Sequence, residues 1–194
     1  MTEIKNENKD LLSVLWAGAD VLRSKMDANE YKTYLLGLIF YKYLSDAYLM
    51  KAYDLIEDAE PADLHEALDT YTELYNSDDR DDLLSELKDI LHYTLKPEQT
   101  YTHFIDLIDQ NKFERSMLQD GFNSVEASDE LFTGLFADVD LYSNRLGTGD
   151  TKQSATISEL LLELNKADLI HAEGDVLGNA YEYLIGQFAS ETGK

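Results

Sequence analysis

Apolar positions at helical spacing run along most of the chain, and the longest such pattern lies between Asp27 and Asp46. No residue from 33 to 41 is charged, and the apolar residues there would cover every side of a helix. In a water-soluble protein, such a helix is buried by other helices. The run is also much shorter than the ~20 residues that a membrane span needs. The pattern therefore predicts a buried central helix from Ala28 to about Asp58.

Local signals refine this central helix. Asp27 and Glu30 have the spacing of a capping box, in which each carboxylate accepts a backbone N–H of the first turn. Gly37 in mid-helix is unfavourable by about 1 kcal/mol relative to alanine, which favours a close contact with another helix there. The second half is predicted to turn a stripe inward, made of Phe40, Tyr43, Ala47 and Met50.

Further helical patterns follow the same 3.6-residue period. They predict helices at 11–24, 62–75 with Pro61 at its start, 78–91, 101–110, 114–127 and 175–190, a short helix at 129–136, and one opening at Thr156 or Ser158. Trp16, the single tryptophan, is assigned to the core. Residues 144–153 are the most loop-like, and no strand is predicted. The sequence therefore predicts an all-α fold, a multi-helix bundle around one long central helix.

Charge is distributed unevenly along the 194 residues, whose formal net charge is −23. Between Asp54 and Asp109 there are 17 acidic and 3 basic residues, whereas between Asp20 and Lys51 there are 4 acidic and 5 basic. Such acidity argues against general binding of phosphate backbones by the whole chain. The central helix and its approach are thus the region in which to look for an anionic partner.

No catalytic or metal site is predicted. The four histidines are far apart in sequence, and cysteine is absent, which removes thiolate ligands, thiol nucleophiles and disulfides. Gly147 and Gly149 lack the lysine and the spacing of a phosphate-binding loop. Most of the thirteen tyrosines are interpreted as helix-packing residues with hydroxyls in water, although some could stack on bases. The polar N-terminus does not resemble a signal peptide, so a cytoplasmic location without a membrane is expected.

Three stretches resemble the methylase subunit of type I restriction–modification systems, the HsdM family. They are LWAGADVLRSKM at 15–26, continuing to residue 46, NRLG at 144–147, and DVLGNAYEYLIGQFASETGK at 175–194. The resemblance implies a parent enzyme that methylates adenine N6 in DNA with S-adenosylmethionine. It also implies that residues 175–194 form a helix leading into a Rossmann-type methyltransferase domain that is missing here. Pro61 and Pro97 are isolated, so the family's Asn-Pro-Pro-aromatic motif is absent, and the chain is expected to be a non-catalytic fragment.

The same resemblance suggests an organisation and partners. The expected segments are 1–143, an N-terminal helical domain, 144–174, a loop plus helix, and 175–194, the helix toward the catalytic domain. Expected partners are DNA, a specificity subunit, a second methylase subunit and, in the full complex, a restriction subunit. The expected role is subunit assembly and DNA clamping. Candidate contacts to DNA phosphate or to an acidic partner face are Lys25, Lys32, Lys42 and Arg145, with solvated lysines as the alternative.

Two other functions remain open from the sequence. An acidic protein with rows of aspartates along its helices could mimic DNA and occupy the DNA-binding groove of a restriction enzyme. A stand-alone helical interaction protein is the third possibility. The family-like stretches favour the methylase interpretation over both.

Overall fold

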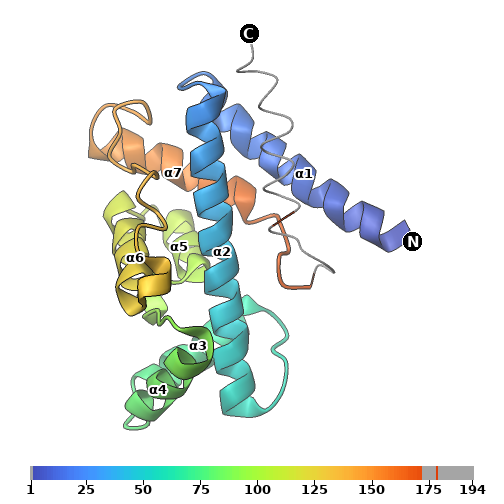
Figure 1. Ribbon diagram of the computed structural model, residues 1–194, viewed down its shortest axis with the longest axis vertical. Helices are drawn as coiled ribbons and strands as arrows, with labels where there is room; N and C mark the ends of the chain where they lie inside the picture. The colour runs from blue at the N-terminus through green and yellow to red at the C-terminus, as the bar shows by residue number, and fades with distance from the viewer. Residues whose placement is uncertain (1, 172–177, 179–194) are drawn as a thin grey trace. The chain divides into compact units, whose positions relative to one another are not determined.

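The computed structural model describes residues 2–171 and 178, and these residues form helices without a strand (Figure 1). This confirms the predicted all-α class. In chain order the elements are α1 (Thr2–Arg23), α2 (Ala28–Glu57), α3 (Leu64–Tyr75), α4 (Arg80–Leu91), η1 (Pro97–Gln99), α5 (Tyr101–Asp109), α6 (Arg115–Ser128), η2 (Glu130–Phe132) and α7 (Asp150–Leu164). The helix predicted at 175–190 lies outside the described residues.

The chain forms two compact units. Unit 1 comprises Met1–Phe40 and Ala137–Lys194, and unit 2 comprises Tyr41–Phe136. Helix α2 belongs to both, with residues 28–40 in unit 1 and residues 41–57 in unit 2. Each unit is described separately below.

Helix α2 has the predicted length and start. Its 30 residues span about 45 Å at 1.5 Å per residue. The capping box is present: the Glu30 N–H donates to Asp27 Oδ1 at 3.2 Å, and the Asp27 N–H donates to Glu30 Oε2 at 3.3 Å. Every residue from 30 to 53 is buried or partly buried. This burial was predicted, because the sequence of the helix leaves it no polar face. The predicted inward stripe was wrong, because its four residues are only partly buried. The deepest positions in this half of the helix are Tyr41, Ser45, Asp46, Tyr48, Leu49 and Ala52.

In unit 1, helices α1 and α7 pack together, with Leu15, Leu22 and Leu160 fully buried. Gly37 allows Val139 to approach α2 closely, because a Cβ added at Gly37 would lie 2.5 Å from Val139 Cγ2. The close contact was predicted, but its partner is a loop residue rather than another helix. Trp16 was wrongly assigned to the core. Its ring is 42% exposed, and the Arg23 guanidinium lies 3.8 Å from the ring centroid.

Unit 2 is built around buried tyrosines. Tyr41 Oη donates to the Gln99 carbonyl at 2.5 Å, Tyr71 Oη to the Leu95 carbonyl at 2.5 Å, and Tyr93 Oη to the Leu44 carbonyl at 2.6 Å. The predicted wet hydroxyls are therefore wrong for these residues. Each hydroxyl instead satisfies a carbonyl within the core and so fixes a connection between segments distant in sequence.

Helix α1 begins at Thr2 rather than at residue 11, and α4 begins at Arg80 rather than at residue 78. Three further segments also differ from prediction. Helix α3 begins at Leu64 because Asp63 caps it, accepting the Glu66 N–H at 2.8 Å, so Pro61 stays in the preceding loop. Helix α7 begins at Asp150, earlier than predicted. The segment 129–136 forms only the short 3-10 helix η2.

Candidate functional site

The loop at 142–149 of unit 1 is held by two side chains of α7. Gln153, only 3% exposed, directs its Nε2 at the carbonyls of Tyr142, Ser143 and Gly147 at 3.2, 3.3 and 3.1 Å. Thr156 Oγ1 donates to the Leu146 carbonyl at 2.6 Å. These four hydrogen bonds anchor the backbone of the loop to α7.

Gly147 completes this loop for a steric reason. Its φ is 154°, and a Cβ added there would lie 2.7 Å from the Lys152 Cβ. With the backbone closed onto α7, the loop exposes Tyr142, Asn144, Arg145 and Thr148 to solvent. Polar and aromatic side chains on a rigid loop form a surface suited to recognition.

Arg145 connects this loop to the start of α2. Its Nη1 lies 2.8 Å from Glu30 Oε2, and the two side chains are 57% and 36% exposed. The same Glu30 oxygen accepts the Asp27 N–H of the capping box. Nearby in unit 1, Tyr34 Oη donates to the Asp140 carbonyl at 2.5 Å, which gives the segment before the loop a second anchor on α2.

Two of the other predicted contact residues lie close to Glu30 along the chain. Lys25 is exposed in the turn between α1 and α2, two residues before the cap. Lys32 is partly exposed and lies two residues after Glu30, which places it on a different side of α2. Lys25, Lys32 and Arg145 thus lie around the N-terminal end of α2 rather than on one face, and we call these three residues the basic surface.

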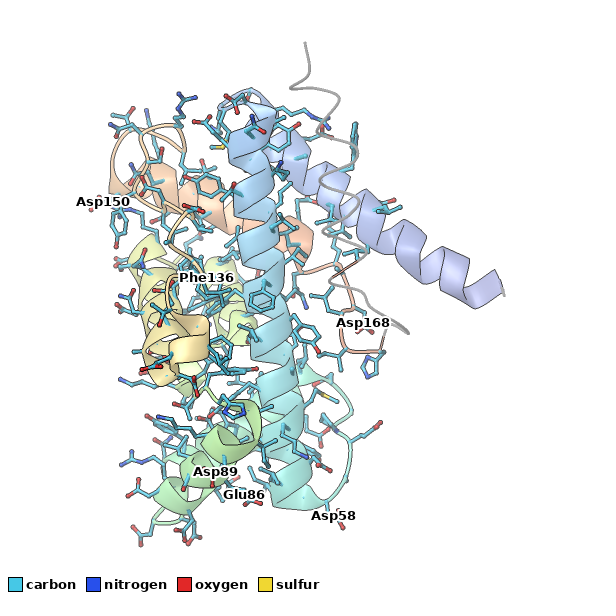
Figure 2. All side chains as sticks on the ribbon, viewed as in Figure 1. Asp58, Glu86, Asp89, Phe136, Asp150 and Asp168 are labelled. Carbon is cyan, nitrogen blue, oxygen red and sulfur yellow. The ribbon has the colours of Figure 1, made fainter. Side chains whose placement is uncertain are left out.

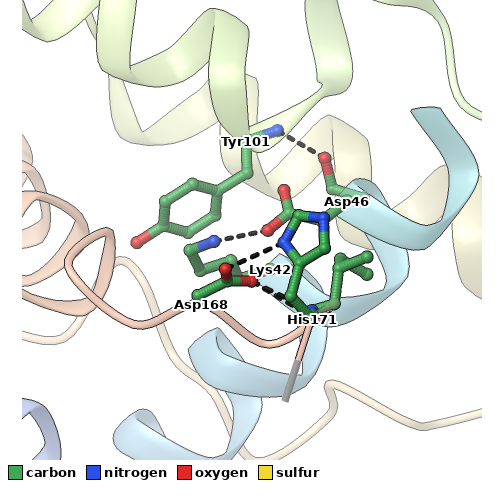
Figure 3. A network of polar contacts seen from close by, with 7 residues as sticks. Lys42, Asp46, Tyr101, Asp168 and His171 are labelled. Carbon is green, nitrogen blue, oxygen red and sulfur yellow. Dashed lines mark hydrogen bonds and ion pairs between the residues drawn. The ribbon is translucent and has the colours of Figure 1, made fainter. Parts of the chain in front are cut away.

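Lys42 does not belong to the basic surface. It is 2% exposed and forms an ion pair with Asp46 one turn along α2, and its Nζ lies 5.5 Å from the Tyr101 ring centroid (Figure 3). The Tyr101 N–H donates to Ser45 Oγ at 2.7 Å in the same cluster. A buried lysine cannot reach a phosphate, so its predicted role as a surface contact is replaced by a role in the core of unit 2.

Exposed carboxylates dominate α3 and α4. Glu86 and Asp89 of α4, labelled in Figure 2, are exposed. Near them along the chain are further exposed acids, Asp69, Glu73, Asp78, Asp79, Asp81 and Asp82. This surface repels nucleic acid and attracts positively charged protein surfaces.

Metal-ligating side chains do not cluster in the described part of the chain. Residues 2–171 and 178 contain no group of three or more His, Asp or Glu side chains placed to hold a metal ion. A hydrogen bond to Asp106 raises the pKa of His65, an ordinary surface pairing. A groove of about 610 Å³ in unit 2, beside Gln99, His103 and Met117, holds no such group either.

Comparison with known proteins identifies the family. Residues 11–164 match the model of the HsdM N-terminal domain. The chain belongs to this family. The resemblance seen in the sequence is thereby confirmed, and the basic surface lies within the matched residues.

Similar proteins carry consistent names. A type I restriction–modification methyltransferase subunit from Streptococcus thermophilus, whose crystal structure is known, is 45% identical with a TM-score of 0.90 over 96% of this chain. The type I restriction enzyme MpnII methylase subunit of Mycoplasma pneumoniae is 30% identical over 93% of the chain. The MjaVIII methylase subunit of Methanocaldococcus jannaschii is 29% identical over 99% of it.

The HsdM N-terminal domain accounts for only part of these relatives. This chain spans 40% of the Streptococcus protein, 35% of the Mycoplasma protein and 29% of the Methanocaldococcus protein. Among the described residues, none of the helices has the length and apolar character required to cross a membrane.

Proposed function

We propose that this domain serves a type I modification enzyme that transfers a methyl group from S-adenosylmethionine to adenine N6 in DNA. The observation that carries the proposal is the match to the Streptococcus methyltransferase subunit over nearly the whole chain. We assign the methyl-transfer chemistry to a separate methyltransferase domain of the parent enzyme. Its place of action is the cytoplasm, where DNA and the methyl donor occur together.

Methyl transfer by the full-length protein tests this activity. The protein, purified with its specificity subunit, should move labelled methyl groups from S-adenosylmethionine into DNA. Chromatography of the digested nucleosides should place the label in N6-methyladenine. Label in methylated cytosine would contradict the adenine assignment, and no transfer by the assembled, folded enzyme would contradict the methylase proposal.

The domain's own role in this proposal is assembly and DNA clamping. The basic surface contacts DNA phosphates, because Lys25 and Arg145 are exposed and the loop that carries Arg145 is already ordered. Phosphate contacts fix the position of a protein on the duplex without reading sequence. Base reading belongs to the specificity subunit, with a second methylase subunit and a restriction subunit completing the assembly.

The distribution of acidic residues fits a domain that contacts DNA only through the basic surface. Residues 54–109 of unit 2 contain 17 acidic and 3 basic residues, whereas the basic surface is in unit 1. We assign the acidic side of α3 and α4 to solvent or to basic surfaces of partner subunits. Replacing Glu86 and Asp89 with glutamine should then affect subunit assembly rather than DNA affinity, as measured by light scattering of the complex.

A further inference from the structure

We propose that Glu30 competes with DNA phosphate for Arg145, so that DNA binding exchanges the partner of this guanidinium. The inference rests on the proposed function and concerns the regulation of the same basic surface. It starts from the ion pair between Arg145 Nη1 and Glu30 Oε2, at 2.8 Å.

The pair is easily opened. Both side chains are substantially exposed, and exposed ion pairs contribute at most about 1 kcal/mol. Glu30 has a second donor, the Asp27 N–H at 3.3 Å, so its carboxylate keeps a hydrogen bond when Arg145 leaves. The start of α2 therefore stays capped in either arrangement.

The guanidinium can exchange partners without moving the loop. Gln153 and Thr156 hold the backbone carbonyls of Tyr142, Ser143, Leu146 and Gly147, so only the Arg145 side chain has to turn. Arginine presents a planar fork of N–H donors that binds a phosphate through two parallel hydrogen bonds. A DNA phosphate can accept two such bonds from Arg145, whereas Glu30 accepts one in this structure.

The Glu30 charge also acts against DNA directly. Its carboxylate lies between Lys25 and Lys32 along the chain and cancels part of their positive field. Glu30 therefore limits the affinity of the basic surface for any duplex.

The test compares variants of the full-length protein assembled with its partner subunits, binding a fluorescent duplex at low salt. Glu30→Gln keeps the capping geometry, because glutamine also serves at that position. It should increase affinity by up to about fivefold, the equivalent of 1 kcal/mol. Arg145→Gln should weaken binding and reduce the salt slope by about one. In the Arg145→Gln background, Glu30→Gln should lose most of its effect.

The outcomes separate the two levels of the proposal. If Arg145→Gln weakens DNA binding but Glu30→Gln leaves affinity unchanged or lower, partner exchange is refuted and the DNA-contact role stands. If Arg145→Gln leaves DNA affinity unchanged while the complex dissociates, Arg145 serves an acidic protein partner, and both proposals fail for this residue. If Glu30→Gln raises DNA affinity equally with and without Arg145, the Glu30 charge acts only through its electrostatic repulsion of DNA, and partner exchange is also refuted.

Discussion

Replacing Gly121 of α6 with alanine is the sharpest test of the packing in unit 2. A Cβ at this position would lie 2.0 Å from Tyr41 Oη and 2.8 Å from Tyr41 Cζ. The ring cannot move aside, since it packs edge-on against Phe122 and Phe136 with centroids 5.4 and 5.8 Å away. Displacing it would also break the bond from Tyr41 Oη to the Gln99 carbonyl.

The expected loss of stability follows from three contributions. Overpacking a core costs about 1–3 kcal/mol. A buried carbonyl left without a donor costs about 1–3 kcal/mol. Alanine regains about 1 kcal/mol over glycine within a helix. The net expectation for Gly121→Ala is a decrease of about 3 kcal/mol in the free energy of unfolding.

Urea unfolding followed by circular dichroism measures this change. With a slope of about 2 kcal/mol per molar, the midpoint should fall by about 1.5 M. Asn123→Ala, at an exposed position of the same helix, is the matched control and should change stability by less than about 0.5 kcal/mol. Gly121→Ala with an unchanged or higher midpoint would refute the assignment of Tyr41 as an immobile core residue.

Three further predictions concern pH, charge and the loop. Burial raises the pKa of Tyr48 to about 12, so the folded protein retains a proton that the unfolded chain loses near pH ~10. This stabilisation is complete below pH ~10 and is lost as pH rises toward about 12. A melting temperature that does not fall over this pH range would contradict the prediction. Lys42→Met removes the cation that pairs with buried Asp46 and should lower the free energy of unfolding by about 3–5 kcal/mol, whereas the double variant with Asp46→Leu should regain the stability. An unchanged urea midpoint for Lys42→Met alone would refute this. Gln153→Leu should speed amide exchange in residues 142–149, and unchanged exchange there would show that other contacts hold the loop.

Local signals in the sequence were sufficient for α2. The Asp27–Glu30 capping box and the uncharged run fixed its start and its burial, because both depend on residues close together in the chain. The inward stripe failed for the reason that made the burial prediction succeed. A helix covered on every side has no polar face, so its apolar pattern does not reveal which side is deepest.

Trp16 and Pro61 show how a plausible local assignment is overruled. Leu15, Ala19 and Leu22 form the buried stripe of α1, and Trp16, one position off, extends toward solvent. Pro61 suits a first helical position, but Asp63 supplies a side-chain cap and Pro61 does not, so α3 begins after the aspartate.

The candidate site was only partly accessible from the sequence. The basic residues could be nominated from charge, yet Lys42 and Lys32 look alike in a sequence, and only the structure separates the buried from the exposed one. The Asp46 carboxylate one turn later was an available hint of an internal pair. The Arg145–Glu30 contact joins residues 115 positions apart, and no local pattern predicts it. Gln153 was missed because nothing in a lone glutamine shows that three carbonyls surround its amide.

In the proposed function, the basic surface of this HsdM N-terminal domain holds DNA. The most direct measurement is the salt dependence of DNA affinity for the assembled enzyme carrying Lys25→Glu, Lys32→Glu and Arg145→Glu together. The control reverses three exposed lysines of unit 2, Lys88, Lys96 and Lys112, and so makes the same change in net charge. We predict a large loss of affinity and a salt slope lower by about three for the first variant, with little change for the control. Equal losses in both variants, or none in either, would contradict the claim.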